Sequence, residues 1–600
     1  MKQHELDQLD RRAYATQIKR RITAPNAPTW ILGFDTEYVF PSELDYTAPH
    51  GVSWQLSEGN GRGHFMPIDR ESGRVSLEDI TLACEELRED RAPHTRLVVL
   101  ASWFAQAEMS VIQIGEDADS IIPEVIYHGE NVGWKWQVKY SKRKVITYVL
   151  YDLTAFYGIK KLSKVAPPDM QKLEWDHSTT TLDSVYDRAF RDYALQDAHI
   201  CQRLAADLHD EFARNWGMNP FQISSAGRAA ALIFQHVYLK DALTQAVPRV
   251  RSLALRAFRG SGDYGGIWAR GVFQGSYAEY DGTGAFPAAA AALGKLPRRK
   301  DWRMWQEGED WPETGIYRAQ FTWPEGVRYT LMAITQTASG LEQYSYPRQG
   351  VDVFSGFELR AAERLGADIR IIYGWCYSEG TGRLPETLRD FRRRREVLTG
   401  EGRASLGDVY KNLGNTLIGK LGQHRAHSGV HWAVEDDKPV LAPTGSLYQS
   451  FGTVFAPEWW VLIIGYFRSV MMEVIETRGA LHAQVDAVLI PYTGEESFTV
   501  RGITFTRRAY GDKLILPRRN TWLIERAGEV QKFAAYGGRD IPELRAVMRA
   551  WKGERVAHQF TTTDFLKVRD AAVTGLPLMS RFKHVGTFKL PALEQGRGEA

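Results

Sequence analysis

Apolar runs of strand length alternate with longer amphipathic segments along this chain, and several of these runs end on carboxylates. The segment 30–38, Trp-Ile-Leu-Gly-Phe-Asp-Thr-Glu-Tyr, predicts a buried strand that finishes with Asp35 and Glu37. Residues two apart on a strand share a face, so these two side chains point the same way. Because like charges repel at short range, the pair indicates either a solvated strand end or a cation site.

Two further apolar runs, 97–101 and 145–150, predict strands that are followed by acids. Glu108 lies on the helix expected after the first run, and Asp152 follows the second run directly. A helical pattern over 184–212 then carries Tyr193 and Asp197. Their spacing of four places the phenol and the carboxylate on one helical face, where a routine surface hydrogen bond is the alternative interpretation.

The segment 280–287, Tyr-Asp-Gly-Thr-Gly-Ala-Phe-Pro, follows small residues and precedes an alanine-rich run. It predicts a strand that ends on Asp281, turns sharply and opens a helix near Pro287. A carboxylate beside free backbone N–H groups can hold a divalent cation against phosphates. An ordinary Asp-Gly turn is the alternative.

Later in the chain, a basic helical run over 390–396 precedes Lys411 and Asn415, which share a face on the next predicted helix. The segments 432–443 and 457–477 predict a hairpin and a long helix, and Asp486 begins an apolar strand. Residues 541–588 predict a mostly helical region with scattered bases.

Composition narrows the class of protein. The chain has 600 residues, of which 44% are hydrophobic and 25% charged, which is typical of a globular protein with several domains. We expect no membrane span and no secretory signal, and the three scattered cysteines predict no zinc module, so a cytoplasmic location is expected. The net charge of +2 means that nucleic-acid binding would depend on local basic patches.

Taken together, the early acids resemble the exonuclease domain of DEDD-type 3′–5′ proofreading enzymes, which has an RNase H-like fold. The resemblance covers roughly Pro28 to His209. It implies two metal ions bound by Asp35, Glu37, Glu108 and Asp197, with Tyr193 orienting the attacking water. The family usually has Asp where this chain has Glu108, and Asp152 is the rival for that position.

The later motifs resemble those of family B DNA polymerases. Motif A, Asp-x-x-Ser-Leu-Tyr-Pro, corresponds to 281–287; motif B, Lys-x-x-x-Asn-Ser-x-Tyr-Gly, to 411–419; and motif C, Asp-Thr-Asp, to 484–486. Gly284, Ile418 and Gln484 depart from the family pattern. The resemblance implies that Asp281 and Asp486 bind the two metal ions of polymerisation.

The same resemblance implies further contacts. Phe286 would lie under the nucleotide sugar and exclude a 2′-hydroxyl, and the remaining nucleotide ligands would be Arg395, Lys411 and Asn415. The Tyr-x-Gly-Gly motif of the protein-primed group is matched by Tyr264, Gly265 and Gly266, with 258–260 as an overlapping rival. Arg519 and Trp522 stand in for the Lys-x-Tyr motif that contacts DNA at the primer end, with 532–536 as a rival.

We therefore predict a multidomain α/β and α+β protein, with an RNase H-like 3′–5′ exonuclease domain and a right-hand polymerase of palm, fingers and thumb. Motif intervals of 130 residues (Asp281 to Lys411) and 67 residues (Gly419 to Asp486) leave room for the insertions of the protein-primed phage and linear-plasmid group. The predicted divisions are a 1–27 extension, a 28–215 exonuclease domain, a 216–270 connector, a 271–385 palm with insertion, 386–425 fingers, a 426–530 palm with second insertion, and a 531–600 thumb and tail.

The function implied is DNA-directed DNA synthesis with proofreading, replicating a mobile element, phage or plasmid genome. The cofactor implied is magnesium (Mg2+), with Mn2+ as a substitute. The expected partners are template-primer DNA, deoxynucleoside triphosphates and, in the protein-primed group, a terminal priming protein. We expect a monomer that binds no membrane. The alternatives are a 3′–5′ exonuclease with a degenerate polymerase half, and a non-catalytic DNA-binding replication scaffold.

Overall fold

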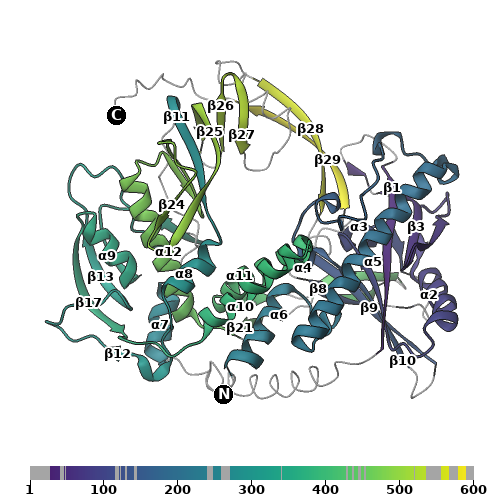
Figure 1. The fold of residues 1–600 in the computed structure, drawn as a ribbon, viewed down its shortest axis with the longest axis horizontal. Helices are drawn as coiled ribbons and strands as arrows, with labels where there is room; N and C mark the ends of the chain where they lie inside the picture. The colour runs from purple at the N-terminus through teal and green to yellow at the C-terminus, as the bar shows by residue number, and fades with distance from the viewer. Residues whose placement is uncertain are drawn as a thin grey trace.

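The chain builds two large sheets joined by helices, as seen in a computed structural model (Figure 1). This mixture of sheets and helices agrees with the predicted multidomain α/β and α+β class. The structure describes residues 28–588 except 41–45, 48, 115–120, 122, 129–130, 141–144, 240–246, 258–270, 339–340, 428–429, 436–437, 444–447, 452–453, 519–520, 535–555 and 566–578. The predicted extension over 1–27 lies outside the described residues.

The N-terminal sheet has seven strands in the order β4-β3-β1-β6-β10-β9-β8. The central strands β1, β6 and β10 run parallel, whereas β3 and β9 run antiparallel to their neighbours. The three strands predicted from apolar runs are therefore confirmed as β1, β6 and β10. The bounds are β1 Thr29–Val39, β3 His50–Gly59, β4 Arg62–Pro67, β6 Leu97–Ser102, β8 Glu124–His128, β9 Asn131–Lys139 and β10 Val145–Asp152.

Helix α5 (Arg188–Trp216) packs across β1. This contact determines which side chains of the helix can meet those of the sheet. The helix begins at Asp187, which accepts the Ala189 N–H at 2.7 Å. Its closest approach to the sheet is at Gly33, where an added Cβ would lie 1.8 Å from the Ala198 carbonyl oxygen. Glycine at this position therefore lets helix and strand backbones come into contact. The other helices of this region are α2 Leu77–Arg91, α3 Ala105–Met109 and α4 Thr154–Tyr157.

The C-terminal sheet is also seven-stranded, in the order β22-β23-β11-β25-β26-β27, with β24 paired to β25. The long strand β11 runs antiparallel to both β23 and β25. The turn after β11 leads into α8 (Ala285–Ala292) through Gly284, whose φ of 55° favours glycine. The bounds are β11 Gly271–Gly282, β22 His482–Gln484, β23 Ala487–Pro491, β24 Ser497–Val500, β25 Ile503–Arg518, β26 Thr521–Arg526 and β27 Glu529–Ala534.

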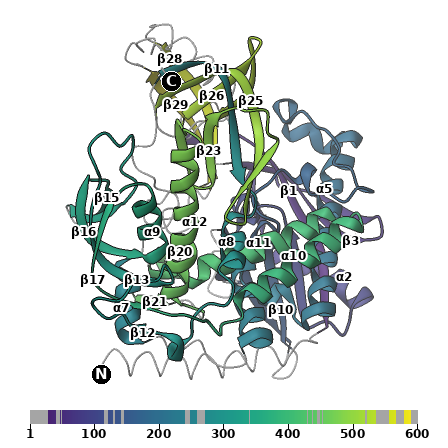
Figure 2. The same ribbon diagram turned by 60° about the vertical axis from the view of Figure 1, so that its left-hand side comes forward.

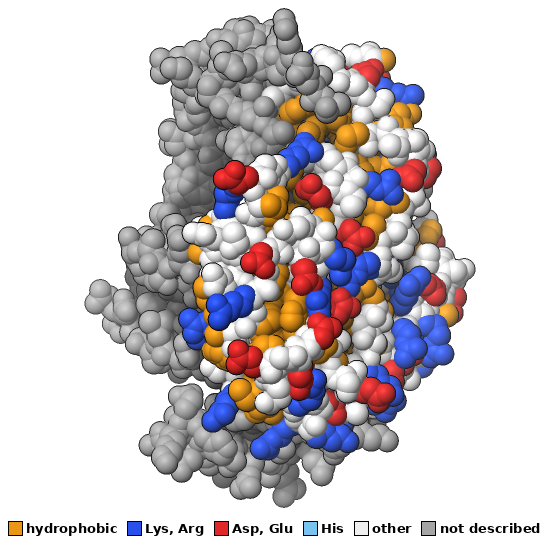
Figure 3. All heavy atoms as spheres, turned by 90° about the vertical axis from the view of Figure 1, so that its left-hand side faces the viewer, with side chains coloured by type: hydrophobic (Ala, Val, Ile, Leu, Met, Phe, Trp, Pro, Cys, Tyr) orange, Lys and Arg blue, Asp and Glu red, His pale blue; other side chains and the backbone are white. Residues whose placement is uncertain are grey.

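Helix α12 (Pro457–Thr477) matches the predicted long helix and is buried almost all round. An α-helix that is apolar on every side belongs in a core, and α12 packs on α7, α8 and α9. A smaller sheet, β12-β17-β13-β16, lies beside α9. On that side of the molecule, basic, acidic and apolar side chains are interspersed (Figure 3). The bounds are α7 Pro248–Arg256, α9 Gly356–Arg364, β12 Arg303–Met304, β13 Gly315–Thr322, β16 Gln349–Ser355 and β17 Asp368–Cys376.

The antiparallel helices α10 (Leu384–Gly400) and α11 (Ala404–Leu421) lie between the two large sheets (Figure 1), and Figure 2 shows them beside α8 from another side. They contact α8 on one side and α4 and α6 (Ala226–Ile233) on the other. One apolar core runs without interruption from the N-terminal sheet through these helices to α12 and the C-terminal sheet. The two sheets are therefore held together by packing as well as by the chain.

Near the C-terminus, the structure corrects one prediction. Within 541–588 the described residues form two antiparallel strands, β28 (Val556–Phe565) and β29 (Met579–Phe588), rather than helices. The three consecutive threonines 561–563 in β28, and the single valines and phenylalanines of both segments, favour strands. Strand β29 also pairs with β2 (Tyr46–Thr47), so the two ends of the described chain meet in one small sheet.

The remaining elements are short. The predicted hairpin over 432–443 is confirmed as β19 paired with β20. No helix among the described residues is long and apolar enough to cross a membrane. The bounds are β5 Val75–Ser76, β7 Ile112–Gln113, β14 Ile334–Ala338, β15 Leu341–Ser345, β18 His424–His427, β19 Val430–Glu435, β20 Lys438–Pro443 and β21 Tyr448–Phe451, with 3-10 turns at Leu162–Lys164, His177–Thr179, Leu182–Tyr186, Pro220–Gln222 and Arg299–Asp301 and a π-helical segment at Phe234–Leu239.

Candidate functional site

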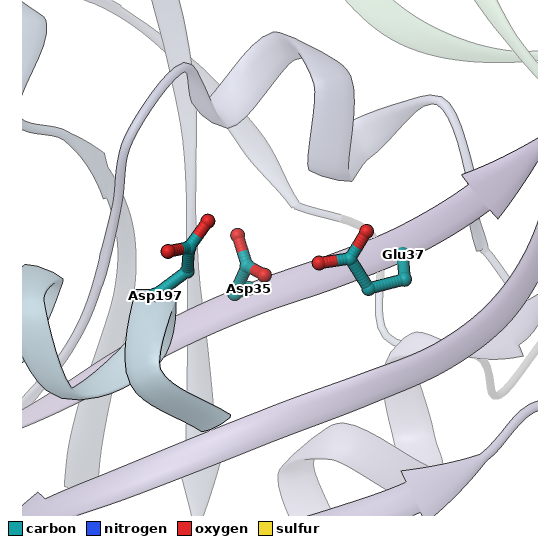
Figure 4. A group of neighbouring side chains, drawn as sticks. All are labelled: Asp35, Glu37 and Asp197. Carbon is teal, nitrogen blue, oxygen red and sulfur yellow. The ribbon is translucent and has the colours of Figure 1, made fainter. Parts of the chain in front are cut away.

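Three buried carboxylates converge where α5 crosses β1, and we call them the N-terminal acid cluster: Asp35, Glu37 and Asp197. Each offers an oxygen, and these oxygens all lie within 4.8 Å of one another. Figure 4 shows Asp35 and Glu37 along one strand and Asp197 reaching toward them from the helix. The close approach at Gly33 brings the helix near enough for this meeting.

The electrostatics of this cluster favour a bound cation. Burial, followed by the charges of Glu108 and Glu37, raises the pKa of Asp35 well above its usual value. Burial and the charge of Asp197 do the same to the pKa of Glu37. Converging carboxylate oxygens are the ligands that magnesium and manganese prefer. A divalent cation among them would remove the repulsion, so the residues fit a metal site.

Lys172 completes this site and was missed by the sequence analysis. Its ammonium group donates to Asp197 and lies 3.5 Å from the Tyr193 hydroxyl. Burial lowers the pKa of Lys172, but the charge and hydrogen bond of Asp197, with the charges of Asp35 and Glu37, together outweigh burial, so the net shift is upward. His177 lies on the other side of Tyr193, with its Nε2 atom 3.3 Å from the hydroxyl oxygen. Lys172 lies in an irregular segment, where periodicity gives no signal.

The two rival acids differ in what they contact. Glu108 accepts hydrogen bonds from the hydroxyls of Thr36 and, at 3.0 Å, Ser102. Its charge acts on both Asp35 and Glu37, and burial raises its own pKa to about 8. Glu108 therefore borders the cluster, although its oxygens are not among the three that converge.

Asp152 supports the neighbouring backbone instead. It accepts the Thr154 N–H at 2.8 Å and the Thr154 hydroxyl at 2.5 Å. Burial raises its pKa to about 6, while hydrogen bonds from Thr154 and from the backbone of Phe104 and Ala105 oppose the shift. These backbone groups lie where α3 begins. Asp152 thus holds the start of the helix that carries Glu108.

A second group, the C-terminal acid pair, consists of Asp281 and Asp486. Asp281 is next to last in β11, and Asp486 lies in the turn between β22 and β23. The Gly282 N–H donates to the Asp486 carbonyl at 2.8 Å, which fixes the turn against the strand. Burial and then the charge of Asp281 raise the pKa of Asp486 to about 6. The two acids, far apart in sequence, therefore meet.

Arg508 on β25 faces this pair and was not predicted. Its guanidinium donates twice to the same oxygen of Asp281, at 2.7 and 3.1 Å. Gln484, at the first acid position of motif C, is half-buried at the end of β22. The site therefore has two acids and an arginine where the family pattern has three acids. Two converging carboxylates at a strand end still fit a divalent cation.

The predicted nucleotide ligands lie on three adjacent helices. Phe286 on α8 packs edge-on against Phe467, with ring centroids 5.2 Å apart. Lys411 and Asn415 are both exposed on α11, as expected for one helical face. Arg395 on α10 pairs with Asp408 at 3.6 Å.

Ile418 replaces the family tyrosine. It is buried in the core, so it cannot reach a ligand from that position.

The predicted DNA contacts are only partly described. Tyr264, Gly265, Gly266 and Arg519 lie outside the described residues. Trp522 is buried in the C-terminal sheet and donates its indole N–H to Glu279 at 3.0 Å. Trp522 therefore packs within the sheet, and its part in contacting DNA at the primer end stays a prediction. Lys532, in the rival segment, pairs with the other oxygen of Glu279.

No protein-family model and no curated protein matches the sequence. Solved structures of Phi29 DNA polymerase do match, each covering 94% of this chain and 100% of their own. The complex with primer-template DNA and incoming nucleotide substrates has a TM-score of 0.66 at 12% identity. The post-translocation complex with primer-template DNA has a TM-score of 0.64 at 13% identity. The chain therefore has the fold of Phi29 DNA polymerase, and the resemblance to protein-primed family B polymerases inferred from the motifs is confirmed at the level of the fold.

Proposed function

We propose that this chain is a DNA-directed DNA polymerase with a 3′–5′ proofreading exonuclease. The observation that carries the proposal is the meeting of Asp281 and Asp486 at a strand end, beside helices that present exposed basic and amide side chains. Support for the fold comes from the Phi29 DNA polymerase structures, which include complexes with primer-template DNA.

In synthesis, Asp281 and Asp486 would hold divalent cations against the triphosphate. Bound Mg2+ would supply Lewis-acid activation of the phosphate and of the attacking primer hydroxyl. Lys411 and Arg395 neutralise charge on the departing pyrophosphate. Phe286 restricts the space beneath the sugar and so favours deoxynucleotides.

In excision, the N-terminal acid cluster would hold the cations, with Glu108 completing the set. Tyr193 orients the attacking water, because its hydroxyl lies between Lys172 and His177, at 3.5 and 3.3 Å. The Lys172 ammonium stabilises negative charge that develops on the phosphate. Its hydrogen bond to Asp197 keeps it in place while no phosphate is bound.

The domain assignment follows from these sites. We assign 28–215 to the exonuclease, 216–270 to a connector, 271–385 and 426–530 to the palm with its two insertions, 386–425 to the fingers and 531–600 to the thumb. Helices α10 and α11 would thus be the fingers, and β19–β20 would belong to the second insertion. The protein would act as a monomer in the cytoplasm and replicate a phage or plasmid genome. A priming protein would be its partner at initiation.

A pair of assays on one preparation tests it. Wild-type protein with Mg2+ should extend a labelled primer on a single-stranded template and degrade labelled single-stranded DNA from its 3′ end. Asp281→Asn and Asp486→Asn should abolish extension, while Glu529→Gln, at an exposed acid on the same sheet, should leave it unchanged. Absence of extension by the wild type would reject the polymerase.

One observation favours a second candidate, an exonuclease with a degenerate polymerase half. In the C-terminal acid pair, the Arg508 guanidinium donates to the carboxylate of Asp281, where a cation would bind, and Gln484 stands where the family pattern has an acid. This candidate predicts excision without template-dependent extension under any metal concentration. Extension assays with and without a primer, and with Mn2+ replacing Mg2+, separate the two.

A further inference from the structure

A fully buried acid, Glu211, joins α5 to the helical pair α10–α11. Its side chain is 0% exposed and receives a forked contact from Arg394 of α10. The Arg394 Nε and Nη2 atoms donate to the two carboxylate oxygens at 2.7 and 2.8 Å. The Tyr410 hydroxyl of α11 donates to Oε1 at 2.8 Å. One carboxylate therefore binds both helices at once.

The surrounding contacts keep this arrangement in one geometry. Trp216, the last residue of α5, donates its indole N–H to the Tyr410 hydroxyl at 2.9 Å. The same indole packs edge-on against Phe391 of α10. Burial alone would raise the pKa of Glu211, but Arg394 and Tyr410 outweigh burial and lower it. Glu211 is thus charged, paired and enclosed.

Helix α11 is tied to the N-terminal region along its length. The Ser405 hydroxyl donates to the Val165 carbonyl, and the Asn412 amide donates to the Phe156 carbonyl, both at 2.8 Å. Lys160 pairs with Asp408 at 2.6 Å, and the same Asp408 pairs with Arg395. Asp408 lies three residues before Lys411 on α11, so these contacts border the exposed face that carries Lys411 and Asn415.

The anchoring residues sit directly beside the proposed nucleotide ligands. Arg394 precedes Arg395, and Tyr410 precedes Lys411. Consecutive residues on a helix point about 100° apart, so fixing one sets the direction of the next. A buried, forked ion pair at Arg394 therefore determines where Arg395 can reach.

Helix α5 extends this constraint to the excision site. Asp197 and Glu211 are separated by fourteen residues on one continuous helix, which corresponds to about 21 Å. Asp197 belongs to the N-terminal acid cluster, and Glu211 holds the fingers. One rigid helix thus positions Asp197 in the N-terminal acid cluster and, through Glu211, the two helices that carry the proposed nucleotide ligands.

We propose that Glu211 is a positioning residue through which the exonuclease domain sets the fingers helices, and with them the affinity for the incoming nucleotide. The inference rests on the proposed function, because the nucleotide ligands are those of the proposed polymerase. Loss of the anchor would let α10 and α11 shift by a fraction of a helix width. Arg395 and Lys411 would then bind the triphosphate less tightly, and the loss would appear as a raised KM.

The test compares two variants with a matched control on the same helix. Glu211→Gln removes the charge, and Arg394→Lys keeps the charge but loses the fork. Asp210→Asn is the control, because Asp210 precedes Glu211 on α5, is exposed, and pairs at 3.4 Å with its neighbour His209 on the same helix. For each protein, the KM for deoxynucleotide, the kcat of extension, the rate of single-strand excision and the hydrogen exchange of α10 and α11 are measured.

The expected result for Glu211→Gln and Arg394→Lys is a KM raised by about 10-fold or more, with kcat and excision within about 2-fold of wild type. Exchange should quicken in α10 and α11 but not in the N-terminal sheet. Asp210→Asn should match wild type in all four measurements. An apolar double variant, Glu211→Leu with Arg394→Met, should restore stability by packing but not restore the KM.

Three outcomes would overturn the inference. The first is an unchanged KM in both single variants. The second is a parallel loss of extension, excision and exchange protection throughout the protein, which would mean general destabilisation. The third is unchanged exchange in α10 and α11 in Glu211→Gln, which would refute the anchor whether or not the wild type polymerises. Failure of the wild type to extend any primer would instead reject the proposed function.

Discussion

The two acid sites differ in how far the fold has closed around them. The N-terminal acid cluster is buried, and its carboxylates raise one another's pKa values while Lys172 and Glu108 surround them. The C-terminal acid pair is open, and its Asp281 is neutralised by the half-exposed Arg508. A buried cluster depends on a cation for its stability, whereas an open pair can exchange one cation for another. The difference would suit the two proposed activities, excision at the buried cluster and synthesis on a duplex at the open pair.

The largest expected effect separates the two sites. Asp35→Asn and Asp197→Asn should reduce single-strand excision by on the order of 100- to 1000-fold, because each removes a ligand from a site built on charge. Primer extension by the same variants should stay within about 2-fold of wild type. Gel assays on end-labelled DNA measure both. Equal loss of both activities would show that the two acid sites do not function independently.

The close contact between α5 and β1 gives the next effect. Gly33→Ala places a methyl group 1.8 Å from the Ala198 carbonyl oxygen, so the helix must move away from the strand. We expect a loss of about 1–3 kcal/mol in the free energy of unfolding, with excision reduced because Asp197 moves with its helix. Gly284→Ala, at the turn of the other site, meets no atom within 4 Å and should cost only about 1–2 kcal/mol from its φ of 55°. Chemical denaturation and excision assays compare the two variants.

The stability of the metal-free protein should fall as pH rises. The pKa values of Asp35 and Glu37 are raised in the folded state, so the folded protein holds more protons than the unfolded chain between the two sets of pKa values. The contribution of these acids to stability is therefore largest near pH 4 and decreases toward pH 8, where Glu108, with a pKa raised to about 8, also loses its proton. Melting temperatures in chelator test this, and added Mg2+ should restore the loss at pH 8. A flat profile in chelator would mean that the acids are not repelling one another.

The smallest effect concerns Arg508. Arg508→Ala removes the cation that competes for Asp281, so Mn2+ should bind the C-terminal pair more tightly, by up to about 5-fold, since exposed ion pairs contribute 0.2–1 kcal/mol. Calorimetric titration of Mn2+ into an Asp35→Asn background reports on this site with the other weakened. Arg508→Lys, which keeps the charge, is the control. Weaker Mn2+ binding in Arg508→Ala would mean that Arg508 supports the site rather than competing for it.

Sequence patterns located the elements that carry strong periodicity. The strand ending at Asp35 and Glu37 and the helix at 457–477 were predictable because burial imposes a clear pattern on each. The hairpin over 432–443 was predictable because acidic turn residues separate its two apolar runs. The convergence of Asp197 on that strand was expected only through the family resemblance. Its physical cause is Gly33, whose need for a bare backbone appears only when the helix is in place.

Other residues could not be found this way. Lys172 lies in an irregular segment, and Arg508 is one of two adjacent arginines on a strand, with nothing in the sequence to separate it from Arg507. The hydrogen bond from the buried Trp522 indole to Glu279 joins residues that are far apart in the sequence, so no local pattern predicts it. The strands β28 and β29 lie in a region that was predicted to be helical, although the threonine run 561–563 favours a strand.

The pairing of Tyr46 with Phe582 has a consequence for biosynthesis. The N-terminal sheet uses only early residues and can form while the ribosome is still translating the rest. Strand β2 can pair with β29 only after almost the whole chain has been synthesised. The entropy of closing so long a loop also makes this contact form late in folding. A nascent chain stalled before β29 would therefore expose the edge of β2 to other molecules.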